Sequence, residues 1–247
     1  VELEGRCVLL GDHTHVVKDG ARMPGVVSLR ENSETQRKPS YFRGQCWGAV
    51  GLVVGSLGAC FCLPLELRIH QGFRHLGVDE SHDKRHSLSL AQRVVQMGLA
   101  FATRQDRPAW LVLDAFFSTA GVFRLARSVY SIALKQPYLH ILVRAKKNYV
   151  AYFPAAPKAP HRRGPQPLYG DKVQLMECFD HPHLFHTVTC RVYGHLEVVQ
   201  LMSLTLLWKP LGDWLLFICA RTSRGPIVLM SSDLRFSPTT ALELYCV

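Results

Sequence analysis

Two aspartates each end a short apolar segment that is typical of a buried strand. Asp12 closes the run that begins at Cys7, and Asp114 closes the run that begins at Trp110. Short runs rich in Val and Leu are typical of central strands, and an acid at the end of such a strand reaches the edge of the sheet. One such Asp is a common turn residue. Two of them, about a hundred residues apart in a basic chain, indicate paired carboxylates that hold a divalent metal ion over phosphate.

The chemistry that such a pair serves is the breaking of a phosphodiester bond. That reaction needs a nucleophilic oxygen in line with the leaving oxygen, and neutralisation of the charge that builds up on phosphorus. Magnesium prefers oxygen ligands and keeps several waters, so two or three carboxylates suffice. We therefore expect Asp12 and Asp114 to lie on adjacent strands and to share one metal ion.

The first 150 residues predict the elements that must position these acids. Strands are expected over 5–12, 24–30, 46–55 and 61–70, and again over 110–114 and 139–144. Helical periodicity predicts one helix over 83–103, and a second over 119–135 with Ser118 or Thr119 as its N-cap. Several strands followed by alternating helix and strand indicate an α/β core whose antiparallel part comes first.

The amino-acid composition changes between Pro154 and Pro167, where prolines alternate with basic residues. This stretch predicts an extended basic loop, which is equally well a linker or an arm that lies on phosphates. Strand-like runs over 186–193, 196–208 and 214–221 then predict an inserted β-rich module. A core-type strand over 227–230 follows, and Pro238 opens a final helix.

Composition narrows the class of protein. The chain has 247 residues, a formal net charge of +10 and a hydrophobic content of 48%, which predicts a folded domain with a polyanionic partner, nucleic acid before membrane. No apolar run is long enough to span a membrane and no signal peptide is evident, which predicts a cytoplasmic protein. A start without Met and an end within a helix-like stretch predict a fragment.

Cysteines and histidines give no metal pattern of their own. The eight cysteines form no CxxC pair, and most lie in apolar runs, which favours small core residues in a reducing compartment: Cys7, Cys60, Cys62, Cys190, Cys219. His13 and His15 are expected to be polar neighbours of the site, since magnesium rarely takes imidazole ligands. The cluster of His181, His183 and His186 matches no zinc spacing and predicts a loop.

Several segments, in their order along the chain, resemble DDE-type insertion-sequence transposases. The resemblance covers nearly the whole chain, and the segments that carry it are Gly11-Asp12-His13-Thr14, Met23-Pro24-Gly25-Val26-Val27, Lys38-Pro39-Ser40-Tyr41-Phe42-Arg43-Gly44, Cys46-Trp47-Gly48-Ala49, Leu113-Asp114-Ala115-Phe116-Phe117-Ser118, Val143-Arg144-Ala145-Lys146 and Ser231-Ser232-Asp233-Leu234.

This resemblance implies a fold and an organisation of the chain. The implied fold is α/β: a ribonuclease-H-like mixed sheet flanked by helices, with a β-rich insertion before the last core strand and helix. The first part of the catalytic core would cover 1–150, the basic loop and the insertion 151–225, and the last core strand and a truncated helix 226–247. An N-terminal DNA-binding segment, usual in the family, would precede this chain.

The resemblance also implies a site. Asp12 is similar to the first family carboxylate and Asp114 to the second, and together with a third acid they would hold two Mg²⁺ ions, for which Mn²⁺ substitutes. The third acid is a Glu in a signature of Tyr, two residues, Arg, three residues, Glu. Tyr245 fits its start, so its Arg and Glu would fall beyond Val247, and Glu243 is expected to be a solvated helix residue rather than the missing ligand.

The remaining implied contacts are with DNA. Arg144 and Lys146, at alternating positions after a strand, would contact the DNA backbone, although a salt-bridged surface pair is the alternative. Tyr245 belongs to the same DNA-facing group, and Arg162 and Arg163 in the basic loop are candidate phosphate contacts. Trp208 and Trp214 flank a turn in the insertion and either stack on a flipped base, as an aromatic does in relatives, or pack in the core.

The function that these expectations favour is metal-dependent cleavage of transposon ends and strand transfer into target DNA. The partners would be transposon ends and target DNA, bound by a homodimer or a larger synaptic complex associated with the bacterial nucleoid. Two alternatives remain: a ribonuclease-H-like nuclease without strand transfer, and an inactive transposase remnant that only binds DNA.

Overall fold

The structure, a computed structural model, describes residues 1–20, 22–30, 39–70, 88–157 and 164–246. Its centre is a mixed sheet in which β4 pairs with β5 and β2 in antiparallel fashion, whereas β2–β6 and β6–β9 are parallel. The strands of this core are β2 (Arg6–Val17), β4 (Tyr41–Ser56), β5 (Ala59–Ile69), β6 (Ala109–Leu113) and β9 (Leu139–Arg144). An antiparallel part followed by parallel strands is the predicted order.

Further strands extend this core on both sides in the described part of the chain. The short β1 (Glu2–Leu3) pairs with β2, and β3 (Val27–Arg30) pairs with β4. On the other side the sheet continues from β9 to β15, β14, β13, β10 and β11, and β12 pairs with β13. These strands are β10 (Val150–Pro154), β11 (Tyr169–Gln174), β12 (His186–Val192), β13 (His195–Trp208), β14 (Asp213–Thr222) and β15 (Gly225–Ser231).

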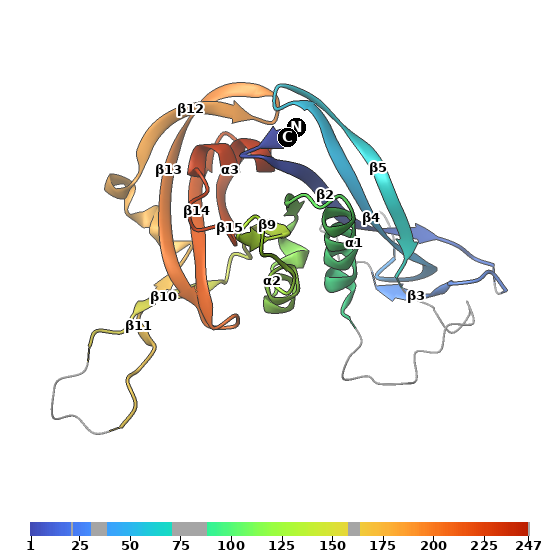
Figure 1. The fold of residues 1–247 in the computed structure, drawn as a ribbon, viewed down its shortest axis with the longest axis horizontal. Helices are drawn as coiled ribbons and strands as arrows, with labels where there is room; N and C mark the ends of the chain where they lie inside the picture. The colour runs from blue at the N-terminus through green and yellow to red at the C-terminus, as the bar shows by residue number, and fades with distance from the viewer. Residues whose placement is uncertain (21, 31–38, 71–87, 158–163, 247) are drawn as a thin grey trace.

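Helices cover the two faces of the sheet (Figure 1). α1 (Leu90–Arg104) and α2 (Ala120–Ala126) pack on one face, and α3 (Pro238–Tyr245) packs on the other. Gly11 of β2 lets α1 pack close to the sheet, because a Cβ atom at this position would lie 2.6 Å from Val94 Cγ1 and 2.8 Å from Leu113 Cδ2. The two faces are called the α1 face and the α3 face below.

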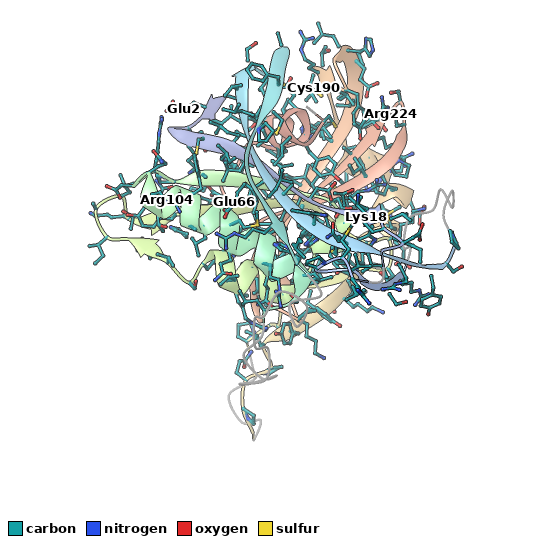
Figure 2. All side chains as sticks on the ribbon, turned by 90° about the vertical axis from the view of Figure 1, so that its right-hand side faces the viewer. Glu2, Lys18, Glu66, Arg104, Cys190 and Arg224 are labelled. Atoms are coloured by element: carbon teal, nitrogen blue, oxygen red, sulfur yellow. The ribbon has the colours of Figure 1, made fainter. Side chains whose placement is uncertain are left out.

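The sheet curls around α3. The hairpins β4–β5 and β12–β13 approach each other above this helix in Figure 1, and Figure 2 shows Cys190 of β12 close to the β4–β5 hairpin. Residues from both ends of the sheet, among them Val53, Leu57 and Val192, belong to one hydrophobic cluster together with α3. The α3 face is therefore the concave side of the molecule.

Local sequence signals account for the helix starts. Ser89 caps α1 with a capping box, in which its side chain accepts from the Gln92 N–H and Gln92 returns a bond to the Ser89 N–H. Ser237 caps α3 and Pro238 occupies its first turn, as predicted. The first helix was predicted over 83–103. It begins at Leu90 in the structure, and the predicted residues 83–87 lie outside the described ones.

The second helix is much shorter than the predicted 119–135. α2 starts after Thr119 as expected but ends at Ala126, and the chain then forms a small hairpin of β7 (Tyr130–Ser131) and β8 (Gln136–Pro137). Ser128, just after the C-cap residue Arg127, donates its hydroxyl to the Leu125 carbonyl. The residues that follow are mostly β-branched, aromatic or Ser, which favour extended backbone over helix.

The cysteines are all free thiols, and the expectation that they lie in the core holds for only some of them. Cys190 and Cys219 are buried, but Cys7 and Cys60 are partly exposed and Cys62 is exposed. Cys62 lies on β5, at an edge of the sheet where one face of the strand meets solvent.

Candidate active site

Asp12 and Asp114 lie on neighbouring central strands of the sheet: Asp114 directly follows β6, whereas Asp12 lies within β2, which continues to Val17 rather than ending at Asp12 as predicted. The parallel pairing of β2 with β6 matches Leu10 with Val112, so two residues further along each strand the two aspartates are level with each other. Leu10 and Val112 belong to the cluster on the α3 face, and side chains two residues apart on a strand share a face. Both carboxylates therefore project toward the concave side.

Each carboxylate accepts one hydrogen bond from the main chain. Asp12 Oδ1 accepts from the His13 N–H at 2.7 Å, and Asp114 Oδ1 accepts from the Phe116 N–H at 2.9 Å. The second bond caps the short helix η2 (Ala115–Phe117). Neither aspartate forms a salt bridge with a residue that the structure describes. The pair thus gathers negative charge that no described cation neutralises.

The electrostatics agree with this geometry. Burial raises the pKa of Asp12, the hydrogen bond from His13 lowers it, and the charge of Asp114 raises it again. A cation between the two carboxylates would relieve both the desolvation and the repulsion.

The donors fit a hard divalent metal ion. Both acids offer only oxygen, which suits Mg²⁺ or Mn²⁺ and does not suit a soft metal. Among the described residues, no group of three or more His, Cys, Asp or Glu is placed to hold a metal ion. The protein ligands available here are therefore two carboxylates, and Mg²⁺ commonly takes its other ligands from water and substrate phosphate.

Tyr245 and Arg144 approach the same site. Tyr245 ends α3, and burial raises the pKa of its phenol to about 12, while the charge of Arg144 lowers it and that of Asp114 raises it. Arg144 is the exposed last residue of β9, the strand next to β6. An exposed guanidinium and a half-buried phenol thus flank Asp114.

His13 lies beneath the carboxylates, on the α1 face. Its Nε2 lies 2.8 Å from Nδ1 of His70, and its ring stacks on Phe117. Burial lowers the pKa of His13 to about 4, with His70 and His15 acting in the same direction. Burial likewise lowers the pKa of His70 to about 4, with Arg93 and Arg68 as further causes. Both rings are neutral at neutral pH, and His70 was not a candidate from the sequence.

Glu243 was predicted to be a solvated helix residue, but in the structure it forms a hydrogen bond to another strand. Its side chain is half-buried and accepts a hydrogen bond from the Arg191 N–H at 3.0 Å, which ties α3 to β12. That contact directs Glu243 to β12 rather than to the two aspartates.

The two tryptophans of the predicted insertion occupy different environments. Trp208 is only 3% exposed, and its ring lies 5.8 Å from that of Phe123 and 5.4 Å from that of Tyr149, so it is a core residue that a base would reach only by displacing these neighbours. Trp214 is half-buried at the start of β14.

The other predicted contacts lie apart from the aspartates or outside the described residues. Lys146 is exposed, two residues beyond Arg144. Arg162 and Arg163 lie outside the described residues. His181 and His183 touch edge to face in a short helical turn (η4, Pro182–Leu184) and its flank, and His186 begins β12.

Comparison with known proteins places the chain in a family. A family model described as DDE superfamily endonuclease matches residues 2–201, which include both aspartates. The chain belongs to the DDE superfamily of endonucleases. A search of curated proteins finds no match to the chain.

Membership of the DDE superfamily agrees with the fold. The mixed sheet flanked by helices is the predicted ribonuclease-H-like α/β architecture, and the family supports a nuclease that acts on DNA. No described helix of this DDE endonuclease has the length and apolar character to cross a membrane.

Proposed function

We propose that this DDE endonuclease is the catalytic domain of a cut-and-paste DNA transposase, which cleaves transposon ends and transfers them into target DNA. One observation carries the proposal: Asp12 and Asp114 are level on two parallel strands, project to the same face and have no described cationic partner. An arrangement of this kind is suited to binding Mg²⁺ against a phosphodiester.

In this proposal Asp12 and Asp114 bind Mg²⁺, two ions in all, with Mn²⁺ as a substitute. The metal, when bound, neutralises charge on the phosphate and lowers the pKa of the attacking water or 3′-hydroxyl. The protein contributes rigidity: Asp12 lies within β2, Asp114 directly follows β6, and each carboxylate is oriented by a main-chain N–H.

The basic residues near the site are proposed to hold the DNA. Arg144 is exposed beside Tyr245 and close enough to influence its pKa, so a phosphate bound by this guanidinium would also reach the phenol. Lys146 continues the same basic edge, and Arg162 and Arg163 would add phosphate contacts from the proline-rich segment. Trp214 is the remaining tryptophan proposed to stack on a base, since Trp208 is in the core.

The organisation proposed for the chain has three parts. Residues 1–150 and 226–247 form the catalytic core, and 151–225 form the insertion. The insertion strand β14 pairs with β15, and β15 pairs with the core strand β9, so the insertion and the core share one sheet. DNA bound to the insertion would therefore be held in a fixed position relative to the site. A homodimer or larger synaptic complex would assemble on the two transposon ends.

The proposal is tested with the full-length protein, Mg²⁺, a supercoiled plasmid and a labelled DNA duplex that carries free 3′-hydroxyl ends. We expect nicking of the plasmid and covalent joining of label to it, and loss of both with Asp12→Asn or Asp114→Asn. Nicking without joining would identify a nuclease instead. DNA binding with neither reaction would identify a binding module.

A further inference from the structure

The two residues that orient the carboxylates are in contact with each other. His13 gives its N–H to Asp12 and Phe116 gives its N–H to Asp114. The rings of these same two residues meet edge to face, with centroids 5.8 Å apart and an interplanar angle of 90°. The two carboxylates lie on the α3 face, and the main-chain N–H groups of His13 and Phe116 hold them there. The side chains of these two donor residues are in contact with each other on the α1 face.

Phe117 forms the base of this contact. Its ring stacks on His13 at 5.2 Å with an interplanar angle of 9°, and it meets Phe116 edge to face at 5.3 Å. Phe117 is fully buried and belongs to the hydrophobic core beneath α1. The core therefore holds Phe117 in place, and the rings of His13 and of the exposed Phe116 pack against it.

His70 contacts the His13 ring as well. It follows β5, is 3% exposed, and pairs with His13 through a nitrogen–nitrogen contact of 2.8 Å. Gly48 makes this possible, because it is the cross-strand neighbour of His13 and a Cβ atom there would lie 2.1 Å from His70 Cε1. His13 Nδ1 is buried without a partner among the described residues, so His70 supplies the ring's polar contact.

The direct pairing of β2 with β6 does not reach as far as the two aspartates. The pairing of β2 with β6 ends at Leu10 and Val112, two residues before each acid. Beyond that point, contacts among the rings of His13, His70, Phe116 and Phe117, which we call the aromatic cluster, join β2 to the segment that follows β6.

We propose that the aromatic cluster is a positioning device, which sets the separation of Asp12 and Asp114 from the opposite face of the sheet. This inference rests on the proposed function, in which the two acids share a metal ion. The members of the cluster are positioning residues, since they act on the metal site through the main chain. Residues that orient metal ligands typically change metal affinity by about tenfold or more when mutated.

The test measures Mn²⁺ affinity of the full-length protein by electron paramagnetic resonance, without DNA, together with thermal unfolding. We expect His70→Ala to weaken Mn²⁺ binding about tenfold. His140→Ala is the matched control: His140 is also a buried neutral histidine, 5% exposed against Trp110, but it lies outside the aromatic cluster. It should lose stability and keep Mn²⁺ affinity within about twofold of the wild type.

Three results separate the possible failures. Equal Mn²⁺ affinities for wild type and His70→Ala would overturn the positioning role. If His70→Ala does not fold, His70→Phe fills the space without a ring nitrogen, and unchanged affinity in that variant would overturn it equally. If instead Asp12→Asn retains Mn²⁺ binding, the proposed function itself fails, whatever His70 does.

Discussion

Replacing Asp12 by Asn should stabilise the metal-free protein. The carboxylates of Asp12 and Asp114 lie at the same level on neighbouring strands without a described cationic partner. Asn keeps an oxygen that accepts the His13 N–H and removes one of the two charges. The variant therefore loses repulsion and desolvation cost while it keeps the local hydrogen bond.

The size of the effect follows from the strand spacing. Two unit charges about 4.8 Å apart repel by about 0.9 kcal/mol in water and by about 3.5 kcal/mol at an effective dielectric constant near 20. The Asp12 side chain is only partly desolvated and remains open to solvent, so solvent screening favours the lower value, and we expect about 1 kcal/mol. For a chain of this size that raises the melting temperature by about 2–4 °C.

The pH dependence has a definite sign. Because burial and Asp114 raise the pKa of Asp12, the folded state holds the Asp12 proton more strongly than the unfolded state. Stability then falls as pH rises through the interval between the unfolded and the folded pKa, and the full penalty is present at pH 7. Asp12→Asn should remove this dependence.

The assay is thermal unfolding at pH 7 in EDTA and in Mg²⁺. The wild type should gain stability from Mg²⁺, and Asp12→Asn should gain little. Asp213→Asn is the control, since Asp213 also accepts the N–H of the next residue at 2.7 Å but pairs with Arg127. A lower melting temperature for Asp12→Asn in EDTA, or an undiminished response to Mg²⁺, would refute the reasoning.

Three further changes test other parts of the structure. Arg144→Gln should weaken binding to any DNA duplex and reduce the slope of log affinity against log salt by about one, measured by fluorescence anisotropy; an unchanged slope would remove Arg144 from the phosphate contacts. Trp208→Ala should lower the free energy of unfolding by about 3–5 kcal/mol in urea titrations, and a fully stable variant with impaired DNA binding would contradict its core placement. Burial lowers the pKa of His140 to about 4, so on acidification the unfolded state takes up the proton first, and the free energy of unfolding falls as pH drops from about 6.5 toward 4. His140→Phe should reduce this loss of stability between pH 7 and 5 by about 1–2 kcal/mol. A pH profile of stability that the substitution leaves unaltered would count against a neutral buried ring.

The paired aspartates could be predicted because their signal is local. Each one ends a short run of apolar residues, and such runs form buried strands in many folds. Their approximate level then follows from the parallel pairing of β2 with β6, which ends two residues before each acid.

Other features depend on contacts distant in the sequence. His70 follows β5 and reaches His13 only because β4 lies between them with Gly48 at the crossing point, a relation set by strand register. The end of α2 was missed because apolar spacing continued into residues whose own preference is extended backbone. A tryptophan beside a turn, such as Trp208, gives no sequence signal of which way its ring points.

The most direct test of a shared metal site is anomalous diffraction from crystals of the protein soaked in Mn²⁺. A shared site should give a peak between the side chains of Asp12 and Asp114, about 2.0–2.2 Å from an oxygen of each carboxylate. A peak that contacts only one of the two aspartates, or Mn²⁺ bound solely elsewhere in the molecule, would contradict it.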